Sequence, residues 1–415
     1  MKLMKVAGLT ALSMILWAAF VGYGVLAGWW HRHIAESGDS QGFMAAAEKM
    51  ISAEPHGDLA LALISNGQLV KEHYASLGTT VNRETLFPVA SMSKWVTAVG
   101  VMELVRTRSI DLDAPVSRYL KRWRLPASQY DLNGVTTRRL LSHTAGLTDG
   151  LGFGDYRLDE RLPSLEDSLR APRASTGRPT VIAVGFEPGS RWQYSGGGYL
   201  ILQLLIEEVA GRPFGDYMRD RVLNPLGMAC SSFDSIPSTK SAGAYDASGR
   251  AASRFQYAAA AATGFSTCVS DMVLWVQAQL EAKSPPLLDA DLLRRMREPH
   301  GQKFGADIWG LGTMLYAPTT KGAFVFGHDG NNAPAINAAV RINPDNGDGI
   351  IVLSSGGRLL AGRLAAEWTY WQTGGPDFLS IETAAHEATF PLIAGLLVAL
   401  AGATLYFRFT APRSK

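Results

Sequence analysis

The sequence predicts an α+β fold, in which an antiparallel sheet is flanked by helices, a helical region is inserted, and a transmembrane helix stands at each end of the chain. Three observations support this fold class. Strand-like runs occur near both ends of the central part, mostly helical patterns lie between them, and an uncharged apolar segment stands at either terminus. Because the strand runs flank the helices, we expect one sheet built from both ends of the domain.

The length of the chain and its charge indicate a globular protein and give no sign of nucleic-acid binding. The 415 residues suffice for one large domain or two ordinary ones with a packed core. The formal net charge is +2, and no basic cluster is interleaved with aromatic residues. The sequence therefore gives no indication of a nucleic-acid partner.

The first apolar segment, Val6–Trp30, follows Lys2 and Lys5 and is long enough to cross a bilayer as a helix. A cleaved signal peptide is the alternative. The apolar run is longer than a typical signal-peptide core, and no clear A-x-A cleavage site follows it. We therefore expect an uncleaved anchor over residues 1–33.

The second apolar segment, Phe390–Phe407, precedes Arg408, Arg413 and Lys415. A buried core helix is the alternative, but the segment has no polar stripe and carries a basic tail. We expect a transmembrane helix within residues 386–415. The positive-inside rule then places both chain ends in the cytoplasm and residues 34–385 on the periplasmic or outer side of a bacterial inner membrane.

The central region begins with a predicted hairpin, in which strands at Leu59–Ser65 and from Leu69 onward flank an Asn66-Gly67 turn. A connector from about Ile34 to Ala46 leads into a first helix before this hairpin. Later helices are expected at Ser91–Thr107, Pro115–Trp123, Thr137–Leu141, Gly198–Val209, Pro213–Val222, Ser270–Gln279 and Arg358–Trp371. Further strands are expected in "WGLGTMLYA", "AFVFGHDG", "INAAVRINP" and "DGIIVLSSG".

The chain has two cysteines, Cys230 and Cys268, without a C-x-x-C motif. In an oxidising compartment they could form a disulfide, or they could remain two buried thiols. The sequence leaves both possibilities open.

The stretch "SMSKWVTAVGVMELV" combines two serines with one lysine. At 100° per residue, Ser91 and Lys94 share one sector of a helix with the apolar Ala98 and Val101, whereas Ser93 lies opposite on a polar stripe. A lysine on the core face is desolvated and can relay a proton. Helix geometry therefore selects Ser91 as the candidate nucleophile, although an isolated S-x-x-K is common by chance.

That polar stripe comprises Ser93, Thr97, Gly100 and Glu103. Without further motifs, Ser91 and Lys94 could equally be a helix cap and a snorkelling lysine.

Four further motifs follow in order along the chain. They are "LLSHTAGL", "FEPGSRWQYSGGGYLIL", "NPLGM" and "GHDGN". Together with "FPVASMSKWVTAVGVMELV", they resemble the serine β-lactamase and penicillin-binding-protein superfamily, most closely its class C β-lactamase-related branch of esterases and D-stereospecific peptidases. The resemblance spans roughly Gly57 to Gly357 and implies a β-lactamase/transpeptidase-like fold.

The resemblance implies a role for each matching residue. Ser91 would be acylated, Lys94 would relay its proton, and Tyr194 would match the tyrosine of the Y-x-N element and act as the base. The backbone amides of Ser91 and Asn331 would hold the oxyanion. The stretch His328-Asp329-Gly330 would match the K-T-G strand at the substrate, with Gly330 allowing a close approach.

Two positions depart from the family pattern. Gly196 stands where Y-x-N has asparagine, and His328 stands where a lysine would hold a substrate carboxylate. Histidine is neutral for much of the time near pH 7 and is a weaker partner for an anion. Both departures disfavour efficient β-lactam hydrolysis.

Other side chains are assigned less specific roles. We expect His143 to be structural, satisfied by loop backbone, and Trp192, Phe153 and Tyr156 to line the cleft or to pack in the core. No spacing of ligands indicates a metal ion, and no motif indicates a cofactor.

The expected activity is hydrolysis of an ester or amide in a small-molecule or peptide substrate through a Ser91 acyl-enzyme. The alternatives are a β-lactamase, a D,D-carboxypeptidase, and a non-catalytic sensor that kept the fold. The sequence leaves the substrate and the oligomeric state open.

Overall fold

The computed structural model describes residues 2–78, 80–150, 155–173, 180–234, 238–280, 288–333, 335–357 and 359–410. Two compact units divide the chain. One comprises residues 1–43 with 366–415, and the other comprises residues 44–365. The predicted domain boundaries at residues 33 and 385 stay a prediction.

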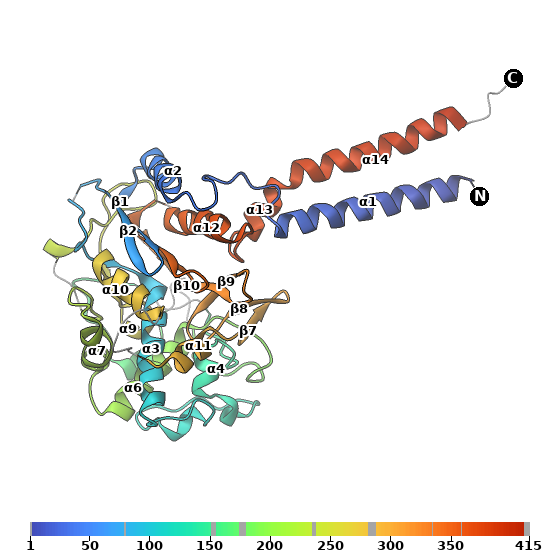
Figure 1. Cartoon of the computed structure of the whole chain (residues 1–415). Helices are drawn as coiled ribbons and strands as arrows, with labels where there is room; N and C mark the ends of the chain where they lie inside the picture. Colours follow the sequence, from blue (N-terminus) through green and yellow to red (C-terminus); the bar gives the residue numbers. More distant parts are fainter. Residues whose placement is uncertain are drawn as a thin grey trace. The chain divides into compact units, whose positions relative to one another are not determined.

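The elements of the described residues alternate much as the sequence indicates (Figure 1). The helices are α1 (Lys2–Leu26), α2 (Ser40–Ala53), α3 (Ser93–Arg106), α4 (Thr137–Leu141), α5 (Leu165–Arg170), α6 (Gly196–Ala210), α7 (Phe214–Met218), α8 (Asn224–Leu226), α9 (Ala260–Thr263), α10 (Val269–Gln279), α11 (Ala290–Arg297), α12 (Leu360–Thr373), α13 (Ile381–Glu387) and α14 (Thr389–Thr410). Single turns are η1 (Ala90–Met92), η2 (Val116–Arg118), η3 (Leu132–Gly134), η4 (Arg219–Leu223) and η5 (Ser238–Lys240). The strands are β1 (Gly57–Ser65), β2 (Gln68–Ala75), β3 (Phe87–Pro88), β4 (Tyr156–Arg157), β5 (Phe255–Gln256), β6 (Ser266–Thr267), β7 (Gly301–Lys303), β8 (Ala306–Trp309), β9 (Met314–Pro318), β10 (Phe324–Asn332), β11 (Ile336–Asn343) and β12 (Asp348–Gly356).

The main sheet joins both ends of the larger unit. Its strand order is β2-β1-β12-β11-β10-β9-β8-β7, and neighbouring strands run antiparallel. The first strand of the chain pairs with the last, with Leu61 opposite Val352. The α+β class and the sheet built from both ends are therefore confirmed.

The predicted hairpin is also confirmed. Asn66 and Gly67 have φ angles of 49° and 73°, which a two-residue turn between right-handed twisted strands requires. The amide of Gly67 donates to the carbonyl of Gly347 at 2.8 Å, so the turn is also held by the loop that precedes β12.

Helix α3 runs through the core of the larger unit. The side chain of Trp95 packs edge-on against Trp275 of α10, with ring centroids 5.3 Å apart, and lies 6.4 Å from Phe326 of β10. Every residue from Ser93 to Leu104 is buried. Over this length the helix is therefore packed against other parts of the protein on all of its faces.

The polar stripe expected on α3 proves to be buried rather than solvated. Thr97 Oγ1 donates to the carbonyl of Ala261 at 2.9 Å, and Glu103 accepts from Arg106 Nε at 2.6 Å. Hydrogen-bond partners from α9 and from α3 itself satisfy these polar side chains. The polar face of α3 is therefore buried and does not face solvent.

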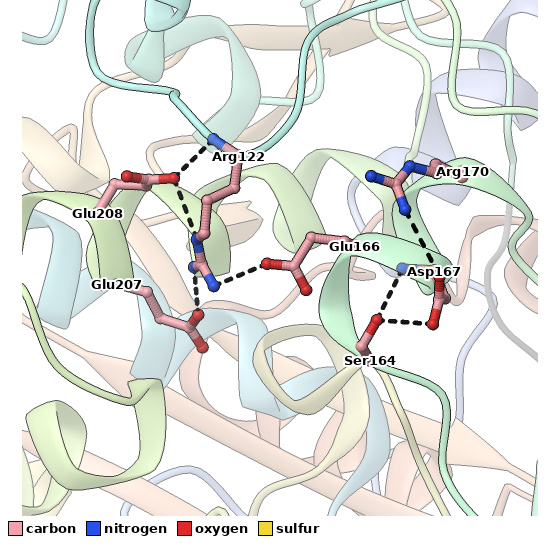
Figure 2. Close-up of polar contacts among 7 residues, drawn as sticks. All are labelled: Arg122, Ser164, Glu166, Asp167, Arg170, Glu207 and Glu208. Atoms are coloured by element: carbon pink, nitrogen blue, oxygen red, sulfur yellow. Dashed lines mark hydrogen bonds and ion pairs between the residues drawn. The ribbon is translucent and has the colours of Figure 1, made fainter.

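The helix expected at Pro115–Trp123 is wrong, because only the single turn η2 forms there. Figure 2 shows the polar contacts that Arg122 makes in this segment. The backbone amide of Arg122 donates to Glu208 at 2.9 Å instead of to a helical carbonyl. Its guanidinium contacts Glu166, Glu207 and Glu208 at 2.7, 2.6 and 3.1 Å. These contacts tie the segment to α5 and to the C-terminal end of α6.

The smaller unit contains the two apolar helices. The indole Nε1 of Trp17 in α1 donates to the carbonyls of Pro391 and Leu392 at 3.1 and 3.3 Å, so α1 and α14 lie side by side. The N-terminal end of α1 and the C-terminal end of α14 lie at the same end of this pair (Figure 1). By length and composition, Met4–Leu26 and Thr389–Phe409 could each cross a membrane.

The helix that closes the central region was expected at Arg358–Trp371. Arg358 lies outside the described residues, and α12 begins at Leu360.

Candidate active site

A tight turn presents Ser91 immediately before α3. Ser91 belongs to η1, and the preceding Ala90 has φ of 44°, a left-handed conformation that costs energy for a residue with a Cβ. Ser93 Oγ donates to the carbonyl of Ala90 at 2.6 Å and accepts from the amide of Phe265 at 2.9 Å. The second serine of the motif therefore supports the turn that carries the first.

Strand β10 packs directly against this turn. A Cβ at Gly330 would overlap the carbonyl oxygen of Val89, which precedes Ala90. Only glycine permits this approach of strand and turn. The close approach expected at Gly330 is therefore made, in this structure, by the backbone of the chain itself.

Lys94 is 2% exposed, and its ammonium lies beneath Ser91. Its Nζ donates to Ser91 Oγ at 3.3 Å and to the carbonyl of Ala262 at 2.9 Å. The same nitrogen lies 5.0 Å from the centroid of the Tyr194 ring. The lysine is thus fixed by α9 and aimed at both candidate reacting groups.

Tyr194 reaches Ser91 from the loop that leads into α6. Its hydroxyl donates to Ser91 Oγ at 3.0 Å, and its ring is half-buried. Lys94, one helical turn after Ser91, and Tyr194, which is far from both in the sequence, are therefore brought within hydrogen-bond distance of the Ser91 hydroxyl oxygen.

His143 fixes the loop that carries Tyr194. It is 2% exposed, with φ of 58°, and its ring centroid lies 4.4 Å from that of Tyr194. The amide of Ser195 donates to its Nδ1 at 3.1 Å, and the amide of Gln193 donates to its carbonyl at 2.7 Å. Burial, together with the charge of Lys94, holds the pKa of His143 well below its usual value. These contacts match the structural role expected for it.

Asp149 holds the same loop from the other side, and nothing in the sequence singles it out. Its carboxylate accepts from Ser195 Oγ at 2.6 Å and from the amide of Gly197 at 2.7 Å. Burial raises the pKa of Asp149. Ser195 Oγ also accepts from the amide of Gly198 at 2.9 Å and caps α6, while the amide of Gly196 donates to Gly150 at 3.1 Å.

His328 is buried on the face of β10 that Gly330 shares. Its Nδ1 lies 2.6 Å from the carbonyl of Asp329, which can only accept, so Nδ1 carries the proton and Nε2 is an acceptor. That Nε2 has no hydrogen-bond partner among the described residues. Burial, followed by the charge of Lys94, lowers the pKa of His328 to about 3. Its ring is therefore neutral at pH 7.

Asp329 points to the opposite face of β10, as strand alternation requires. Its carboxylate forms an ion pair with the fully buried Arg341 of β11 and accepts from the Tyr316 hydroxyl at 3.0 Å. Asn331 is exposed at the end of the strand. The structure therefore brings His328 and Gly330 to the Ser91 side and directs Asp329 away from it.

Aromatic rings surround the base of the site. Trp192 and Trp309 have centroids 5.8 Å apart, and Trp309 lies 4.7 Å from the ring of His143 and 5.4 Å from that of His328. Tyr156 instead contacts Arg173, 4.9 Å from the ring centroid. Phe153 lies outside the described residues.

The sequence of this chain matches a known protein family. Residues 47–374 match the family described as Beta-lactamase. The chain belongs to this family. Its motifs therefore mark membership of the serine β-lactamase and penicillin-binding-protein superfamily, as their resemblance implied.

The curated relatives of this chain carry different names, and each aligns with only part of it. Penicillin-binding protein 4* of Bacillus subtilis is 31% identical over 144 residues, 35% of this chain and 30% of that protein. Esterase EstB of Burkholderia gladioli is 32% identical over 176 residues, 38% of this chain and 40% of that protein. The chain thus spans less than half the length of these curated relatives.

A solved structure supports the fold. The octameric penicillin-binding-protein homologue from Pyrococcus abyssi superimposes with a TM-score of 0.66 at 20% identity, covering 81% of this chain and 78% of that one. The fold is therefore the β-lactamase/penicillin-binding-protein fold.

The neutral, buried His328 predicts a pH dependence of stability. The unfolded chain binds a proton at this residue below pH about 6.5, while the folded chain does so only near pH 3, so stability falls as the pH drops through that window. We expect His328→Gln to remove about 2 kcal/mol of the wild-type loss between pH 7 and pH 5. Denaturant titrations at both pH values measure it. Equal losses in the two proteins would contradict a buried neutral imidazole.

Proposed function

We propose that this protein is a membrane-anchored serine hydrolase that cleaves an ester or amide through an acyl-enzyme at Ser91. The observation that carries the proposal is that Ser91 Oγ lies 3.3 Å from Lys94 Nζ and 3.0 Å from the Tyr194 hydroxyl. A nucleophile within reach of an oriented base is the arrangement that activates serine. Membership of the Beta-lactamase family supports it.

The proposed reaction begins with attack of Ser91 Oγ on the substrate carbonyl carbon. In this step Tyr194 acts as the phenolate, having already given up its own proton: its oxygen takes the serine proton and passes it to the leaving group, while the Lys94 ammonium stabilises the negative charge. The backbone amides of Ser91 and Asn331 would stabilise the oxyanion. Water then attacks the ester carbonyl, and Ser91 regains its proton. Lys94, held by Ala262 at 2.9 Å, orients this exchange.

The proposed substrate lacks an obligatory carboxylate at the β10 position. His328 is buried and neutral there, and the charge of Asp329 is balanced by Arg341 on the other face. Neither side chain therefore places a cation where it could pair with a substrate carboxylate. This favours an esterase or a peptidase acting on uncharged groups over a β-lactamase or D,D-carboxypeptidase.

The proposed location is a bacterial inner membrane, with the catalytic unit on the periplasmic side. Large apolar side chains of α1 and α14 are exposed, among them Leu9, Ile15, Phe390, Leu397 and Val398. Such a surface is unfavourable in water and suits a lipid environment. Both chain ends of the α1–α14 pair lie together, which agrees with two cytoplasmic termini (Figure 1).

A fluorophosphonate probe tests the nucleophile. We expect detergent-solubilised wild type and the exposed control Ser109→Ala to be labelled and Ser91→Ala not, because the probe needs Ser91 Oγ. Tyr194→Phe should lower kcat on a p-nitrophenyl ester between about 100-fold and 10,000-fold, the range for loss of a general base. Absence of acylation of the wild type by any probe would favour a non-catalytic sensor.

Substitution of His328 tests the substrate class. We expect His328→Lys to raise kcat/KM for a cephalosporin or a D-Ala-D-Ala peptide relative to a short-chain ester, by about 10-fold or more, because a cation then faces the substrate carboxylate. His328→Gln, which supplies no charge, is the matched control. A wild type that already prefers the carboxylate substrates would show this assignment to be wrong.

Membrane topology can be measured in intact spheroplasts with a tag on each terminus. We expect the protein to resist alkaline extraction and to dissolve in detergent, because two helices hold it. External protease should digest the catalytic unit and spare both tags. Release by alkali, or digestion of either tag, would contradict the two-anchor arrangement.

A further inference from the structure

The two cysteines lie opposite each other across an antiparallel pair. The amide of Ser232 donates to the carbonyl of Ser266 at 3.0 Å, and the amide of Ser266 donates back to the carbonyl of Ser232 at 2.9 Å. In antiparallel register, two residues back on one segment face two residues forward on the other. This places Cys230, after α8, opposite Cys268, before α10.

Side-chain contacts continue the register. Between the bonded pair and the cysteines, Ser231 Oγ and Thr267 Oγ1 lie 2.7 Å apart. The Sγ atoms of Cys230 and Cys268 and a carboxylate oxygen of Asp271 all lie within 4.8 Å of one another. The doubly bonded pair is Ser232 and Ser266, whereas the amide of Cys230 donates to Asp271. The separation of the two sulfurs, no more than 4.8 Å, is therefore the observation that places the cysteines within reach of a disulfide.

We propose that Cys230 and Cys268 form a disulfide that links the segment after α8 to the start of α10. A metal ion held by both sulfurs and Asp271 is the competing possibility. However, Asp271 Oδ2 already accepts from the amides of Cys230 and Ser231 at 2.9 and 2.8 Å and from Ser231 Oγ at 2.7 Å. A structural zinc site uses four ligands, and this group among the described residues offers three.

Oxidation requires a disulfide donor, such as a thiol-disulfide oxidoreductase or oxidised glutathione. The thiolate of Cys230, the more exposed of the two, attacks one donor sulfur and releases one donor thiol. The thiolate of Cys268 then attacks Cys230 Sγ and releases the second. The protein loses two protons and two electrons, and the donor disulfide becomes two thiols.

The surroundings of the pair set the rate of this exchange. Burial raises the pKa of Cys230 and raises that of Cys268 to about 12, and the nearby Asp271 acts in the same direction. Since the thiolate is the attacking species, closure should become faster as the pH rises.

The link would hold the segment that positions Lys94. Phe265, whose amide donates to Ser93 Oγ, and Ala262, whose carbonyl accepts from Lys94, precede Cys268 by only a few residues. The disulfide closes a loop of 38 residues, since 268 minus 230 is 38. Loops of this length gain stability when closed, because the unfolded chain loses conformational freedom.

The test is alkylation with peptide mass spectrometry on the full chain in detergent. Protein that has been reduced and then treated with oxidised glutathione should give one cross-linked peptide pair containing Cys230 and Cys268, with neither thiol alkylated under denaturing conditions. The oxidised form should melt about 5 °C higher than the reduced form. In Cys230→Ser, the melting temperature should be the same with and without reductant.

Two results would overturn the disulfide. One is two alkylated thiols or only glutathione adducts after oxidation. The other is zinc retained at one ion per chain by wild type and lost in Asp271→Asn. The state of the pair in protein taken directly from cells depends additionally on the proposed periplasmic location. Free thiols there, combined with ready closure by glutathione, would contradict that location and leave Ser91 acylation unaffected.

Discussion

The contact between β10 and the turn at Ala90 and Ser91 is the constraint on which the site depends. Val89 presses its carbonyl into the space that a side chain at Gly330 would fill, and Ala90 is held in a left-handed conformation. Neither feature is favourable alone. The fully buried α3, fixed by Trp95 against α10 and β10, supplies the packing that sustains them. Ser91 is thereby presented at a rigid junction of sheet and helix rather than on a flexible loop.

Tyr194, the proposed base, is positioned by a second set of contacts. Tyr194 lies in irregular backbone, whose amides must find partners when buried. His143 and Asp149 provide these partners on either side of Ser195, so the loop is fixed by side chains where regular structure is absent. His143 can accept from an amide because burial keeps it neutral. The same low dielectric that makes the site reactive therefore also sets the protonation state of its supports.

The sequence predicted those elements whose signal is local. The Asn66-Gly67 turn and the strands of β10, β11 and β12 follow from turn chemistry and apolar patterning, and the helix angle placed Lys94 on a buried face. The helix expected at Pro115–Trp123 was wrong: only one turn forms there, and the amide of Arg122 donates to the distant carboxylate of Glu208. Strands β7 and β8 were not predicted, since three or four residues with half-exposed side chains give little periodicity. The pairing of such short strands with their neighbours depends on the folded arrangement and leaves no local pattern in the sequence.

The same distinction applies to the site. Ser91, Lys94 and Tyr194 belong to recognisable motifs, whereas Asp149 acts only through contacts that folding creates. Arg341, an arginine within the apolar run "INAAVRINP", did carry a signal, because a fully buried cation needs an acidic partner. Asp329 is that acid. Its place beside His328 in the sequence suggested a shared role at the substrate, but strand alternation sends the two side chains to opposite faces.

This separation determines the electrostatics of the substrate side. Arg341 neutralises Asp329 behind the strand, and burial keeps His328 uncharged in front, so β10 presents polarity without charge to whatever lies over Ser91. Lys94 places a cation beside the Ser91 hydroxyl, and the carbonyl of Ala262 in α9 holds its ammonium there. A family whose β-lactam-cleaving members use a lysine on this strand can thus keep the same nucleophile and base while changing what it recognises. The proposed proton-transfer residues Lys94 and Tyr194 lie on α3 and in the loop before α6, whereas His328 lies on β10, so the two proposed roles can be tested by separate substitutions.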